Sequence, residues 1–144
     1  MHQVEFLSRI EHEKVVAAIA DAETRTSGEI RVWISHRQIA DALEAAQKRF
    51  QKLGMHKTAE RNAVLVYIAP RSRVFAVIGD QAVHEKCGDA FWREVTAQLS
   101  TDLKKEPVTE ALVNAIQKIG ALLAAHFPRK PGDKNQLPDE ILGD

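Results

Sequence analysis

Cysteine, net charge and long apolar runs are all scarce in this sequence, and each scarcity excludes a class of protein. The single cysteine, Cys87, cannot form an internal disulfide, which fits a reducing compartment. Lys+Arg 20 against Asp+Glu 20 gives a formal net charge of +0, so no overall field attracts the chain to nucleic acid. No run of about 18 apolar residues and no secretory apolar core is present, so we expect a cytoplasmic protein without a membrane segment.

A β-hairpin within residues 63–79 is the centre of the predicted fold. Two runs rich in β-branched and aromatic residues, 63–69 and 73–79, flank a short connection that can join only antiparallel neighbours. The first run is apolar almost throughout, which is typical of a strand covered on both faces. With 144 residues available for one core, the sequence predicts a single layered α/β domain.

Periodic apolar residues predict the other elements. We expect helices over about residues 9–23, 39–53, 92–103 and 108–123, and a strand over 29–35. Ser8 and Glu11 have the spacing of a capping box, and Gly54 is placed to end the second helix. The predicted buried face of that second helix consists of Ile39, Leu43, Ala46, Phe50 and Leu53. Prolines, glycines and scattered charges follow Pro128, so we predict a domain over 1–128 and a flexible tail over 129–144.

The predicted topology gathers polar residues at one edge of the sheet. The first strand, the second helix and the first hairpin strand form a β-α-β unit, for which parallel pairing is the default. Glu29, at the start of the first strand, and Arg61 and Asn62, before the second, then share an edge. The antiparallel hairpin returns Asp80 to that edge, with Asp89 nearby at the head of the next helix.

Carboxylates at this edge have both a functional and a structural interpretation. Two or three of them with loop carbonyls would suit a hard cation such as Ca²⁺, which takes about six to eight oxygens. Parallel sheets, however, usually bind ligands at the opposite edge. Asp80 can also be an ordinary turn residue, Asp89 can interact favourably with a helix N-terminus, and Glu29 can be a solvent-exposed residue at the end of a strand.

Five segments, in their order and spacing, resemble the TPM domain, the family of the thylakoid-lumen acid phosphatase. They are Ser27-Gly28-Glu29-Ile30, Arg61-Asn62-Ala63-Val64-Leu65-Val66, Ile78-Gly79-Asp80, Asp89 with Phe91-Trp92, and Ile119-Gly120 through His126-Phe127-Pro128. The resemblance implies a three-layer α/β/α sandwich around a small mixed β-sheet of three to four strands. It also implies a cleft that binds a divalent cation, Ca²⁺ in some members, and that in some members hydrolyses phosphomonoesters.

Carried over to this chain, the resemblance assigns roles to five residues. Glu29, Asp80 and Asp89 become metal ligands, with Ca²⁺ expected and Mg²⁺ as the alternative, and Asp80, Asp89 and Arg61 become catalytic. Arg61 and Asn62 would hold the phosphate oxygens of a small phosphorylated substrate. The chain departs from the family pattern at Gly79-Asp80-Gln81, where many members have glycine-tyrosine-glycine.

Two functions follow as hypotheses. The first is a metal-dependent, acid-phosphatase-like hydrolase, in which the cation polarises a phosphoryl oxygen or activates water. The second is a non-catalytic Ca²⁺-binding or protein-interaction module that keeps the cleft and lacks turnover. No histidine can be assigned as a base in the cleft, which favours the second.

Two other groups of residues are weaker candidates for a functional site. Cys87 and Arg93 have the spacing of thiolate phosphatases, but Asp89 would repel the phosphate and Trp92 fits a helical core stripe. His84 and Cys87 could be zinc ligands, but the sequence has no second close pair. We therefore expect Cys87 to be a half-buried apolar residue.

Overall fold

The computed structural model describes residues 9–129 and 141–143. Its four-stranded sheet has the order β3-β2-β1-β4, built from β1 (Glu29–Ile34), β2 (Ala63–Ala69), β3 (Val74–Gly79) and β4 (Ile141–Gly143). β1 pairs in parallel with both β2 and β4, and β2 pairs antiparallel with β3. The parallel β-α-β unit and the hairpin are therefore confirmed.

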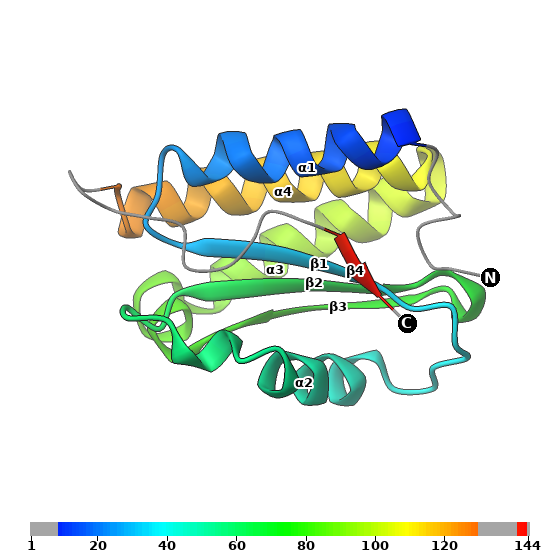
Figure 1. The fold of residues 1–144 in the computed structure, drawn as a ribbon, viewed down its shortest axis with the longest axis horizontal. Coiled ribbons are helices and arrows are strands. Elements are labelled where there is room, and N and C mark those ends of the chain that lie inside the picture. Colours follow the sequence, from blue (N-terminus) through cyan, green and yellow to red (C-terminus); the bar gives the residue numbers. More distant parts are fainter. Residues whose placement is uncertain (1–8, 130–140, 144) are drawn as a thin grey trace.

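Helices cover both faces of this mixed sheet (Figure 1). α1 (Arg9–Glu23), α3 (Gln81–Lys105) and α4 (Val108–His126) pack on one face, and α2 (Ala42–Lys52) packs on the other. Two short 3-10 helices, η2 (Met55–Lys57) and η3 (Pro70–Ser72), lie before and after β2. The three-layer α/β/α sandwich that the sequence predicts is confirmed.

β2 lies at the centre of the core because helices cover it on both sides. All seven of its residues are buried, as its nearly continuous apolar sequence predicts. Val64, Val66 and Ile68 face the layer of three helices, and Leu65 and Tyr67 face α2. Within the described residues, α4 is the one helix long and apolar enough to cross a membrane. Its Leu112, Ile116, Ile119 and Leu123 are fully buried in the core.

α2 begins later than the sequence predicts, and its buried face differs. Asp41 caps it, accepting a hydrogen bond from the Glu44 amide at 3.0 Å, so Ile39 lies in the preceding loop. Ala46 and Phe50 are buried, but Leu43 is 53% exposed, so its predicted place on the buried face is wrong. One residue advances a helix by about 100°, which turns Leu43 away from the face of Ala42, Ala46 and Phe50. Gly54 has a φ of 71°, the left-handed conformation expected just past the helix.

α3 is one kinked helix from Gln81 to Lys105, and it is longer than the apolar stripe over about 92–103 from which the sequence predicts it. Gly88, with φ 71° and ψ −174°, makes the kink, and Asp89 begins the second part.

β4 is absent from the sequence prediction, which assigns residues 129–144 to a flexible tail. Ile141 pairs with Val32 of β1 and is 5% exposed, so residues 141–143 belong to the sheet. Most of the predicted tail, 130–140 and 144, lies outside the described residues, as does the predicted cap at Ser8.

Candidate functional site

The predicted polar edge exists in the backbone of the sheet. Glu29 is the register partner of Ala63, so the N-terminal ends of β1 and β2 lie side by side. β3 ends beside them, because Gly79 pairs with Val64 and the Asp80 amide donates to the Ala63 carbonyl at 2.9 Å. This edge is also where α3 begins, directly after Asp80.

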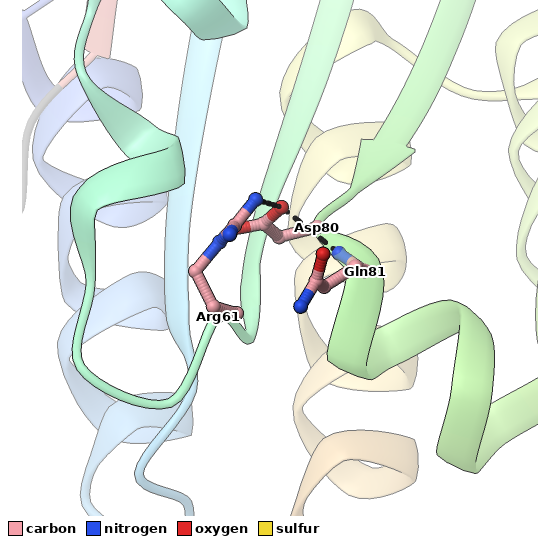
Figure 2. Close-up of polar contacts among 3 residues, drawn as sticks. All are labelled: Arg61, Asp80 and Gln81. Carbon is pink, nitrogen blue, oxygen red and sulfur yellow. Dashed lines mark hydrogen bonds and ion pairs between the residues drawn. The ribbon is translucent and has the colours of Figure 1, made fainter.

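Arg61 and Asp80 form a two-pronged ion pair at the centre of this edge (Figure 2). Arg61 Nε donates to Asp80 Oδ2 at 2.6 Å, and Nη2 donates to Oδ1 at 2.8 Å. Oδ1 also accepts the Gln81 amide at 2.9 Å, so Asp80 is the N-cap of α3. The Asp80 side chain is 6% exposed and that of Arg61 is 40% exposed, so the carboxylate is enclosed and the guanidinium faces outward.

The backbone holds Arg61 in an unusual conformation. Its φ is 55°, in the left-handed region that non-glycine residues rarely adopt. Its amide donates to the Thr58 carbonyl at 3.3 Å, and its own carbonyl accepts from the Ala82 amide at 3.1 Å. The hydrogen bonds to Asp80 raise the pKa of the Arg61 guanidinium. Arg61 is therefore positioned from both sides, by the loop before β2 and by the first turn of α3.

Asn62 has a structural partner of its own. It is 1% exposed, and its Nδ2 donates to the Ser27 hydroxyl at 3.1 Å. This contact joins the start of β2 to the loop between α1 and β1. The close approach is permitted by Gly28, because a Cβ there would lie 2.9 Å from Leu123 Cδ1 and 3.2 Å from the Asn62 carbonyl oxygen.

The other two predicted carboxylates occupy different environments. Glu29 is 1% exposed and not solvated, and strand alternation places it on the α2 side of the sheet, opposite the neighbouring Ile30. Asp89 is exposed on α3, past the kink at Gly88. Throughout residues 9–129 and 141–143, no group of three or more His, Cys, Asp or Glu side chains is arranged to hold a metal ion.

The structure also adds partners that the sequence interpretation missed. The backbone amide of Gln81 and the hydroxyl of Ser27 complete the hydrogen bonds of Asp80 and Asn62. An aspartate followed, after Gln81, by the apolar residues Ala82 and Val83 is the signal that could have identified the helix cap.

The cysteine constellations are not supported by the local structure. Cys87 and Arg93 both lie on α3, so no phosphate-binding loop separates them. Burial raises the pKa of the Cys87 thiol, which disfavours the thiolate that a nucleophile requires.

Comparison with known proteins identifies the family. The family model of the TPM domain matches residues 1–122. This chain belongs to the TPM domain family. Its fold is similar to the solution structure of the BA42 protein from the psychrophilic bacterium Bizionia argentinensis, with 34% identity, a TM-score of 0.91 and 96% of each chain covered.

A more distant likeness concerns the fold alone. The N-terminal domain of the cg2496 protein from Corynebacterium glutamicum has 16% identity and a TM-score of 0.65, over 94% of this chain and 80% of that one. No curated protein matches this TPM domain.

Proposed function

We propose that this TPM domain binds a phosphomonoester at Arg61 without hydrolysing it. The observation that carries the proposal is that Arg61 stays 40% exposed while it holds Asp80. A guanidinium has five N–H donors, and Asp80 accepts two of them, so three are left for a ligand. Phosphate oxygens suit these donors, because a charge-assisted hydrogen bond is short and strong.

The Arg61–Asp80 pair would prepare this site for binding. The enclosed carboxylate fixes the guanidinium plane, so little side-chain freedom is lost when a ligand binds. The carboxylate also offsets part of the arginine charge. We therefore expect modest affinity with defined geometry.

Hydrolysis would need a group that activates water, and the proposal assigns none. Both oxygens of Asp80 accept hydrogen bonds, from Arg61 and from the Gln81 amide, so this carboxylate serves as an anchor. Asp89 is exposed beyond the Gly88 kink and has no described link to Arg61. The geometry therefore supports binding better than turnover.

A divalent cation does not fit the residues as they are arranged. Ca²⁺ takes about six to eight oxygen ligands, and Mg²⁺ demands near-octahedral geometry. The carboxylate nearest to Arg61 is already bound by that cationic side chain, and no acidic trio lies close by within the described residues. A cation would have to displace the guanidinium from Asp80.

Calorimetric titration with phenyl phosphate tests the proposal. We expect saturable binding by the parent, weakened about tenfold or more in Arg61→Gln, the effect of losing a charge-assisted hydrogen bond. Arg93→Gln is the matched control, because Arg93 is an exposed arginine on α3 that is not among the described hydrogen-bond partners of Asp80. Equal affinities in the parent and Arg61→Gln would refute the proposal.

A cation-dependent phosphomonoester hydrolase is the second candidate. It is favoured by the sheet topology, which brings the strand ends carrying Glu29 and Asp80 to one edge. If Asp80 is a cation ligand, Arg61→Gln should bind Ca²⁺ or Mg²⁺ more tightly than the parent, and Asp80→Asn should lose binding. A protein partner is the remaining option if neither phosphate nor cation binds.

A further inference from the structure

A cavity of about 550 Å³ lies at the end of the sheet opposite Arg61. It opens between the β2–β3 turn and the place where α3 ends and α4 begins, two segments found at the same end of the molecule in Figure 1. Its volume falls within the range of about 300–1,000 Å³ that is usual for small-molecule sites. None of the residues described at the Arg61 edge lines this cavity.

Apolar side chains from the sheet and from both helices line the inner part of this cavity. Ile68 and Phe75 are register partners on β2 and β3, on the face covered by α3 and α4. Leu103 of α3 and Val108 of α4 lie opposite them. Replacing the water on such a lining by an apolar ligand lowers the free energy.

The polar lining is cationic. Arg73 and Lys104 are both exposed lining residues, and Ser100 adds a hydroxyl. Neither cationic side chain has a hydrogen bond or ion pair with any described residue, and none of the described lining residues is acidic. Charge complementarity therefore favours a ligand with an anionic group.

The backbone of Arg73 supports a role for its side chain. Its φ is 53°, and the Arg73 amide donates to the Pro70 carbonyl at 3.1 Å to close the turn. Glycine or asparagine would adopt this left-handed conformation at lower cost. Among the described residues the other non-glycine residue with positive φ is Arg61, whose side chain is engaged by Asp80. The side chain of Arg73 has no such partner within the described chain.

We propose that this cavity binds a small amphipathic carboxylate, an acyl or aryl carboxylate. The apolar tail packs on Ile68, Phe75 and Leu103, and the carboxylate lies between Arg73 and Lys104. The head is a single small anion because two cationic side chains flank a cavity whose inner lining is apolar. This site is independent of the phosphomonoester site proposed at Arg61.

Amide chemical-shift titration with sodium octanoate, beside neutral 1-octanol, tests the assignment. We expect octanoate to shift the amides of Phe75, Leu103 and Val108 and to bind about tenfold more tightly than octanol, since charge-assisted hydrogen bonds are the stronger kind. Shortening the chain to hexanoate should weaken binding roughly fourfold for each CH₂ removed. Shifts confined to the Arg61 edge, or equal affinity for acid and alcohol, would overturn the proposal.

A double variant tests the contribution of the two cationic side chains. Arg73→Asn keeps a residue that tolerates positive φ, and Lys104→Gln keeps a similar length. The double variant should bind octanoate no more tightly than it binds octanol. Its affinity for octanol should equal that of the parent protein. Lys105→Gln, an exposed neighbour outside the lining, should behave as the parent. Because all three sites are exposed, thermal unfolding should confirm intact folds, and undiminished octanoate binding in a folded double variant would contradict the proposal.

Discussion

Replacing Asp80 separates its two roles, the N-cap of α3 and the partner of Arg61. Asp80→Asn keeps a side-chain carbonyl that can accept the Gln81 amide but removes the charge. Asp80→Ala removes both. Because loss of an N-cap costs about 1 kcal/mol, the alanine variant should be less stable than the asparagine variant by about that amount. In a domain of this size that difference corresponds to a Tm lower by about 3 °C.

A matched pair of variants at Asp41 isolates the contribution of Arg61. Asp41 caps α2 through the Glu44 amide in the same way, but among the described residues no arginine binds its carboxylate. Urea unfolding followed by circular dichroism should give similar alanine-to-asparagine differences at Asp41 and Asp80. Asp80→Asn should be more destabilising than Asp41→Asn, because only the former breaks an enclosed ion pair. Equal effects of the two asparagine variants would refute the structural role assigned to Arg61.

Three further predictions concern packing and reactivity. Gly79→Ala should destabilise the protein by about 1–3 kcal/mol in urea unfolding, because its Cβ would lie 2.4 Å from Trp92 Cη2, and an unchanged midpoint would contradict that contact. Phe50→Ala should lower the free energy of unfolding by about 3–5 kcal/mol and Leu43→Ser by about 0.5 kcal/mol or less. Similar losses of stability in the two variants would indicate that Leu43 is buried as the sequence predicts. Iodoacetamide should alkylate Cys87 with an apparent pKa above the usual value for a cysteine thiol, since burial disfavours the thiolate, and an apparent pKa below that usual value would reopen the thiolate mechanism.

The fold was predictable where local patterns are strong. The short connection at Pro70–Ser72 requires a hairpin, and the connection through α2 favours parallel pairing of β1 and β2. β4 was not predictable, because its three residues become a strand only through pairing with β1, far away in the sequence. The continuity of α3 through Gly88 was also hidden, since glycine usually ends a helical pattern.

The candidate site was predictable at the level of the backbone. Topology alone brings Arg61, Asn62 and Asp80 to one edge, as the strand register confirms. The choice of partners was not predictable, because it depends on distances within the edge. Asp80 binds Arg61 at 2.6 and 2.8 Å, and Asn62 binds Ser27 at 3.1 Å.

Phosphorus NMR of phenyl phosphate mixed with the protein, with Ca²⁺ or Mg²⁺ added, is the most direct test of the proposed function. It observes the bound ester and any released inorganic phosphate in one sample. We predict a ligand signal that shifts or broadens with the parent, a smaller effect with Arg61→Gln, and no inorganic phosphate in either sample. Inorganic phosphate that accumulates in proportion to the parent protein, and not with Arg61→Gln, would contradict binding without turnover.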